Sequence, residues 1–180
     1  MSLRYKEMKG LKICCLLFFS VSFFEIYAQN INTDTTDTYF RHAIGAGAGY
    51  ITGYGLSYRY MPSKYGVQLN FAPYHDAELD RYSLGITFIY KLIKNKISSL
   101  YLYEGNHYYY NSQLVYTYDP SKTDPTVNRV KTNYFNNGIG FGIEIIIVKR
   151  IGLNLMTGYA FYDNFNQVNI TGETALYYKF

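Results

Sequence analysis

Residues 138–148 read GIGFGIEIIIV, and this stretch decides the fold class. Its large apolar side chains fall on every second residue, and glycines and Glu144 fill the alternate positions up to residue 144. Because side chains alternate between the two faces of a β-strand, one face of this segment is apolar and the other is small or polar. The stretch therefore predicts a strand whose two faces meet very different surroundings.

The same alternation extends outward over most of the chain. In 97–110 both faces carry large side chains, so either Leu100 and Leu102 or Tyr101 and Tyr103 could face outward. We predict an all-β protein with eight strands. Their ranges are 42–50, 55–61, 66–74, 81–92, 97–110, 138–148, 151–162 and 172–180.

The polar face of these segments is rich in glycine and poor in charge. A soluble sandwich places Lys, Glu and Thr on its outer face, so the pattern does not fit one. Glycine on one face is typical of the interior of a narrow barrel, and the apolar face then meets lipid. Lipid also requires closure, since an open sheet edge leaves backbone groups unpaired. The prediction is an eight-stranded antiparallel up-and-down transmembrane β-barrel.

The connections between the predicted strands give a second test. Every other connection is short, namely 62–65, 93–96 and 149–150, as expected for periplasmic turns. The intervening connections are 51–54, 74–80, 111–134 and 163–171, and three of these four are longer. We expect all four outside the membrane. Residues 111–134 contain Leu114 and Val115, so the two strands beside them could instead continue as a projecting hairpin.

The N-terminus has the composition of an export signal. A basic stretch up to Lys12 precedes the apolar run 13–24, and Ala28 supplies a small residue for cleavage. We expect a signal peptide over 1–28, a flexible periplasmic lead over 29–38 and the barrel over 39–180. Both cysteines, Cys14 and Cys15, lie in the signal segment.

The whole chain has 180 residues, with 17 Lys+Arg against 13 Asp+Glu. Residues 1–28 hold four of those basic and two of those acidic residues, which leaves a net charge of +2 in the rest. That balance does not suggest nucleic acid. With 23 Tyr, 12 Phe and only 17% charged residues, simple disorder is excluded.

The last residues, 175–180, read ALYYKF. With the signal peptide and the alternating strands, they resemble the small outer-membrane β-barrel proteins of Gram-negative bacteria, of OmpA/OmpX-like size. The resemblance implies export to the outer membrane, and a final strand (Leu176, Tyr178, Phe180) that is read by the barrel-insertion machinery.

Two groups of side chains follow from the predicted faces. Inside the barrel we expect an ion-pair network in which Glu144 and Glu173 meet Arg59 or Lys91, since isolated charges in a narrow interior are costly. Arg81 and Lys179 are also candidates for the inward face, and so is Glu104. On the outside, tyrosine and phenylalanine near strand ends predict aromatic girdles at the headgroup level. The girdle residues are Tyr58, Tyr60, Tyr82, Tyr90, Tyr159 and Phe161.

The function expected from these features is structural, or a surface interaction through the outer loops, chiefly 111–134. Its basic residues Lys122, Arg129 and Lys131 could pair with lipopolysaccharide phosphates. Beyond outer-membrane lipid and the insertion machinery, the expected partner is a surface protein or a glycan. We expect no cofactor, no metal site and no nucleic-acid partner.

Two alternatives remain open at this point. The first is an enzyme that modifies lipid A or phospholipid. His75, Asp76 and Ser83 are similar to the His, Asp and Ser that palmitoyltransferases of the PagP type use near the outer rim, although no His-x-Ser pair of the PagL deacylase type is present. The second is a secreted soluble barrel that binds an apolar ligand, which requires the apolar faces to point inward.

Overall fold

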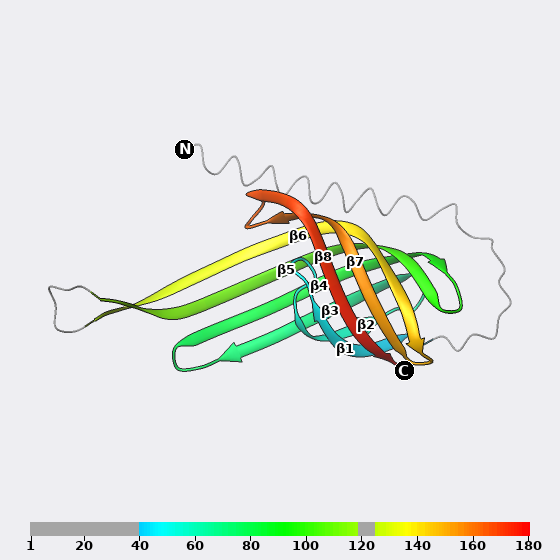
Figure 1. Ribbon diagram of the computed structural model, residues 1–180, viewed down its shortest axis with the longest axis horizontal. Coiled ribbons are helices and arrows are strands. Elements are labelled where there is room, and N and C mark those ends of the chain that lie inside the picture. Colours follow the sequence, from blue (N-terminus) through cyan, green and yellow to red (C-terminus); the bar gives the residue numbers. More distant parts are fainter. Residues whose placement is uncertain (1–39, 119–124) are drawn as a thin grey trace. The chain divides into compact units, whose positions relative to one another are not determined.

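The computed structural model describes residues 40–118 and 125–180, which form one closed antiparallel β-barrel (Figure 1). The predicted signal peptide and lead lie outside the described residues. Each strand pairs with its neighbours in sequence, and β1 also pairs with β8 to close the ring. The strands are β1 His42–Ala48, β2 Gly55–Tyr60, β3 Tyr65–His75, β4 Leu79–Lys94, β5 Ser98–Thr117, β6 Thr126–Val148, β7 Ile151–Tyr162 and β8 Gln167–Lys179. Over the described ranges, the chain contains no helix that is long and apolar enough to cross a membrane.

The closing seam is held by backbone pairing. Ile44 lies opposite Tyr178, and Phe180 exchanges backbone hydrogen bonds with His42, at 2.9 Å from its own N–H and 3.3 Å from the His42 N–H. Closure leaves the sheet without a free edge over this seam.

The apolar side chains of the alternating strands point away from the barrel axis. Leu69, Ile139 and Leu176 are exposed on the outside, while polar residues such as Asn70 and Asn154 are buried inside. In β5 the structure settles the ambiguity, because Tyr101 and Tyr103 are buried and Leu100 and Leu102 face outward. A soluble barrel with an apolar interior is therefore wrong for this chain.

The barrel has two different ends. The terminal end, where β1 begins and β8 ends, carries the connections 61–64, 95–97 and 149–150. The loop end carries the connections 49–54, 76–78, 118–125 and 163–166.

Two expected loops at the loop end turn out to be mostly strand. For 111–134, the projecting hairpin that the sequence left open as the alternative to a loop is confirmed: β5 runs to Thr117 and β6 starts at Thr126, and the two strands pair along their length. Likewise β8 starts at Gln167, within the expected loop 163–171. Figure 1 shows β5 and β6 projecting beyond the other strands, with the shorter β3–β4 hairpin on the same side.

Candidate functional site

A charged cluster fills the interior near the terminal end. Arg59 donates from Nη1 to Glu144 Oε1 at 3.4 Å and to Asn154 Oδ1 at 2.8 Å, and from Nη2 to Gln68 Oε1 at 2.7 Å. Lys179 Nζ donates to the other oxygen of Glu144 at 2.7 Å. The buried carboxylate of Glu144 is therefore paired with two cations, Arg59 and Lys179. Buried charges are tolerated when they are paired in this way.

Aromatic rings and a fourth charge complete this cluster. The guanidinium carbon of Arg59 lies 4.3 Å from the ring centroid of Tyr177 and 5.7 Å from that of Tyr101. Lys91 lines a cavity of about 40 Å³ together with Arg59, Glu144 and Lys179. The terminal end of the barrel is thus packed with side chains and leaves little open space.

Glu173 has a different role from the one expected. Its carboxylate accepts hydrogen bonds from the backbone N–H of Ile51 at 3.0 Å and of Thr52 at 2.9 Å, and from the Thr171 hydroxyl at 2.9 Å. The expectation that it meets Arg59 or Lys91 is therefore wrong. The sequence predicts that the connection 51–54 lies outside the membrane, and this prediction is wrong. In the structure the connection spans 49–54 and folds into the barrel, on the loop-end side of the charged cluster.

The inserted connection, residues 49–54, forms a plug that is held from several strands. Ile51 is 0% exposed and Thr52 is 1% exposed. Asn70 Nδ2 on β3 donates to the Gly53 carbonyl at 3.0 Å. Asn136 Nδ2 on β6 and His107 Nδ1 on β5 bind the Tyr50 carbonyl at 2.9 and 2.8 Å.

A buried Ser83–His107 pair continues the same network. Since His107 Nδ1 must carry a hydrogen to donate to the Tyr50 carbonyl, the neutral ring accepts at Nε2, where the Ser83 hydroxyl lies at 2.9 Å. Ser83 Oγ in turn accepts from the Tyr54 N–H at 3.3 Å. Ser83 and His107 have the side chains of a nucleophile and a base. Both side chains are buried and hydrogen-bonded to the plug, so we interpret them as structural contacts that hold the plug in place.

The interior glycines make room for this plug. A Cβ atom at Gly85 would collide with the Thr52 carbonyl, and one at Gly105 would lie 2.7 Å from the Ile51 carbonyl oxygen. Within the plug, Gly53 has a φ of 77°, which favours glycine. Sequence reasoning found the glycine-rich face but missed its occupant, because nothing local in 49–54 shows that the segment turns inward.

The His75, Asp76 and Ser83 set considered for an enzyme is not assembled. His75 is exposed and shares a hydrogen bond with Asp80, whereas Ser83 is buried beside His107. Within residues 40–118 and 125–180, no three His, Cys, Asp or Glu side chains gather in a way that could hold a metal ion.

Glu104 lies on the outward face of β5, contrary to its expected place inside. It accepts hydrogen bonds from Asn106 at 2.7 Å and from Asn137 at 2.6 Å. The β5 ladder explains this position, because Glu104 shares its face with Leu100 and Leu102.

The expected girdle residues all lie on the outer side of the strands. Five are exposed by 39–64% and Tyr90 is half-buried. They fall into two groups: Tyr58, Tyr60 and Tyr90 near the terminal end, and Tyr82, Tyr159 and Phe161 toward the loop end. In the last strand, Leu176, Tyr178 and Phe180 share the outward face.

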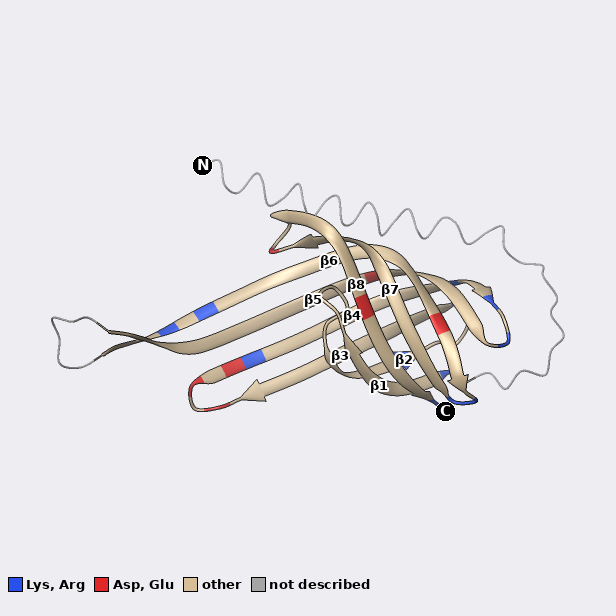
Figure 2. Cartoon of the chain, in the orientation of Figure 1, with Lys and Arg blue, Asp and Glu red and all other residues tan. Residues whose placement is uncertain are grey.

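Charge gathers on the projecting hairpins and at the turns of the terminal end, while most of the barrel wall is uncharged (Figure 2). Of the three basic residues expected in the recognition loop, Lys122 lies outside the described residues and Lys131 is exposed on β6. Arg129 forms an ion pair with Asp80 on β4 at 3.0 Å.

A second contact joins the two hairpins. The Tyr116 hydroxyl donates to Glu78 at 3.1 Å, and this hydrogen bond raises the pKa of Tyr116. The hairpins β3–β4 and β5–β6 form a single projecting sheet because β4 pairs with β5 as far as Leu79 opposite Gln113, and the Tyr116–Glu78 and Arg129–Asp80 contacts add side-chain links between them.

Comparison with known proteins gives matches to solved structures alone, since no family model and no curated protein matches the chain. The N-terminal β-barrel domain of Pseudomonas aeruginosa OprF is 12% identical, with a TM-score of 0.48, covering 77% of this chain and 95% of that one. Neisserial surface protein A is 15% identical, with a TM-score of 0.45, over 77% and 93%. Ail, the attachment invasion locus protein of Yersinia pestis, is 15% identical, with a TM-score of 0.35, over 77% and 93%. The solved structures that the chain resembles are thus small outer-membrane barrels, and its own strand pairing makes it a closed, eight-stranded antiparallel barrel.

Proposed function

We propose that the chain is an outer-membrane β-barrel with a closed interior, which presents its β3–β4 and β5–β6 hairpins at the cell surface. The observation that carries this proposal is the inverted distribution of side chains. Apolar residues such as Leu69, Phe88, Ile139 and Leu176 are exposed around the ring, and charged and amide groups are buried within it. Lipid favours this arrangement and water does not.

The closed interior argues against a role in solute passage. The plug lies across the interior on the loop-end side of the charged cluster, and the charged cluster around Arg59 fills the terminal end. Eight-stranded barrels are narrow enough for side chains to fill them. We therefore assign contacts with lipid and with binding partners to the outer wall of the barrel and to its projecting sheet.

The projecting sheet favours a partner that binds along strands. It exposes Tyr116, Val127 and Val130 beside charged residues, which is the mixed character of a protein-binding surface. Lipopolysaccharide phosphates remain candidate ligands for Lys131, whereas Arg129 is already paired with Asp80. We also propose that residues 1–28 are a cleaved signal peptide, that 29–38 form a periplasmic lead, and that the final strand is read by the insertion machinery.

Single-cysteine labelling tests this placement, because both cysteines of the chain, Cys14 and Cys15, precede the barrel. Tyr118→Cys lies at the tip of β5, and Lys149→Cys lies in the turn between β6 and β7 at the opposite end. With a membrane-impermeant maleimide on intact cells, we expect labelling at residue 118 and labelling at residue 149 only after lysis. If residue 149 alone were labelled in intact cells, the barrel would have the opposite orientation in the membrane. Recovery of the unlabelled protein in a soluble fraction would overturn the membrane location.

A further inference from the structure

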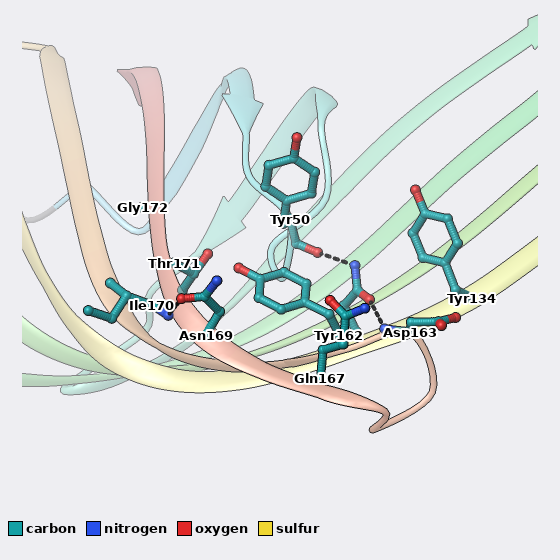
Figure 3. Close-up of a pocket in the computed structure, with 10 residues that line it drawn as sticks. Tyr50, Tyr134, Tyr162, Asp163, Gln167, Asn169, Ile170, Thr171 and Gly172 are labelled. Atoms are coloured by element: carbon teal, nitrogen blue, oxygen red, sulfur yellow. Dashed lines mark hydrogen bonds between the residues drawn. The ribbon is translucent and has the colours of Figure 1, made fainter.

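A cavity of about 510 Å³ opens at the loop end of the barrel, between the plug and the β7–β8 turn. Its size lies in the range of small-molecule sites. Figure 3 shows side chains from four parts of the chain around it. The residues that matter most here are Tyr50, Tyr134, Tyr162, Asp163, Gln167 and Asn169.

One buried amide holds two walls of this cavity together. Asn136, which is 2% exposed, donates from Nδ2 to the Tyr50 carbonyl at 2.9 Å and accepts at Oδ1 from the Asp163 N–H at 3.1 Å (Figure 3). The plug and the β7–β8 turn are therefore both fixed to β6. A site built in this way is largely formed before a ligand arrives, which lowers the cost of binding.

The turn that carries Asp163 is held in an unusual conformation. Asp163, Asn164 and Phe165 have φ values of 49°, 56° and 71°, which non-glycine residues rarely adopt in succession. Two hydrogen bonds fix this turn to Phe135, whose carbonyl accepts from the Asn164 N–H at 3.0 Å and whose N–H donates to Asn164 Oδ1 at 3.1 Å. Strain of this kind is typical of segments that position a ligand-binding group.

The lining combines aromatic rings with uncharged polar groups. The rings of Tyr50 and Tyr162 meet edge to face, with centroids 6.1 Å apart and planes at 82°. Gln167 and Asn169 add amide groups, which donate and accept hydrogen bonds. Among the described lining residues, Asp163 carries the charge and no Lys or Arg is present.

This chemistry selects one class of ligand. A saccharide ring has a C–H face that packs on tyrosine and a rim of hydroxyls that amides and a carboxylate can bind. A sulfated or phosphorylated ligand would meet Asp163 without a lining cation to balance its charge. A lipid chain would leave the amides and the carboxylate buried without partners. We propose that the mouth of the barrel is a binding site for an uncharged saccharide.

The site goes beyond the projecting sheet proposed above, and its test does not need the protein to be in a membrane. Barrel refolded in detergent and shown to be folded by its heat-dependent gel mobility would be applied to an array of uncharged and sulfated glycans. We expect at least one uncharged glycan to be bound, with its affinity then measured by titration calorimetry. The cysteine-labelling experiment measures location and the glycan array measures binding. A negative result in one experiment therefore does not affect the conclusion drawn from the other.

Two variants and one control locate the binding. Tyr50→Ala removes a ring that is 66% exposed while keeping the backbone carbonyl, and Gln167→Ala removes an exposed amide. Each should weaken binding of the uncharged glycan by about tenfold. Tyr118→Ala, at a tyrosine 73% exposed on the distant hairpin, should leave binding unchanged. The proposal is overturned if the folded barrel binds no uncharged glycan, if it binds only sulfated ones, or if the loss of Tyr50 has no effect.

Discussion

Glu173 offers the sharpest test of the plugged interior. Its carboxylate accepts from two backbone N–H groups of the plug, Ile51 at 3.0 Å and Thr52 at 2.9 Å. Hydrogen bonds to charged groups contribute roughly 1.5–3 kcal/mol each, so the pair is worth roughly 3–6 kcal/mol when no water replaces it. Water can enter the polar space left by a truncated side chain, so we expect Glu173→Ala to lower the free energy of unfolding by about 2–4 kcal/mol.

Glu173→Gln separates hydrogen bonding from packing. Glutamine keeps one oxygen for Ile51, but its NH2 group faces the N–H of Thr52, so one bond is lost without a change in volume. The expected loss is about 1.5–3 kcal/mol, no larger than that of alanine. Lys149→Ala removes an exposed charged side chain from the β6–β7 turn and serves as the control.

The assay is equilibrium unfolding in urea with the protein in lipid vesicles, read as the fraction with folded gel mobility. A planar-bilayer recording adds a second readout, because a released plug should raise ion conductance. If Glu173→Ala unfolds at the wild-type urea concentration and stays electrically silent, then Glu173 does not hold the plug. A glutamine variant that is less stable than the alanine variant would refute the hydrogen-bond account.

Three further perturbations test other parts of the structure. Arg59→Met leaves a buried carboxylate with one cation fewer, and should cost about 3 kcal/mol in the same urea titration; wild-type stability would contradict the ion-pair assignment. Ile139→Lys on the outward wall should cost about 2–4 kcal/mol in lipid vesicles, whereas Val130→Lys on the projecting hairpin should cost nothing measurable; equal effects would mean that the wall does not face lipid. Gly85→Ala drives a methyl group into the plug and should raise conductance in planar bilayers, and an unchanged recording would show that the plug lies elsewhere.

The sequence alone predicts the strand order and the faces, and the reason is local. A side-chain period of two can be read from any one strand, so Ile139 and Leu155 are assigned outward without knowledge of their neighbours. The inward places of Arg59 and Glu144 follow from the same alternation. Their contact, however, joins residues 85 positions apart and depends on the barrel register.

Where both faces of a strand carry similar side chains, the sequence does not show which face points inward. In β5 both faces carry large side chains. Tyrosine can lie on either face, because its hydroxyl finds hydrogen-bond partners both in a polar interior and at the membrane–water interface. The structure buries Tyr101 because its hydroxyl reaches Asn154 at 3.0 Å on β7. The choice between a loop and a hairpin over residues 111–134 is likewise decided by the pairing between β5 and β6.

The sequence by itself thus determined an eight-stranded barrel with an apolar outside, because alternation along a strand depends only on that strand. Only the tertiary structure decided that residues 49–54 fold inward and that Glu173 binds them instead of Arg59. The partners of that plug come from β3, β4, β5, β6 and β8, so its position is fixed by groups that meet only once the ring has closed.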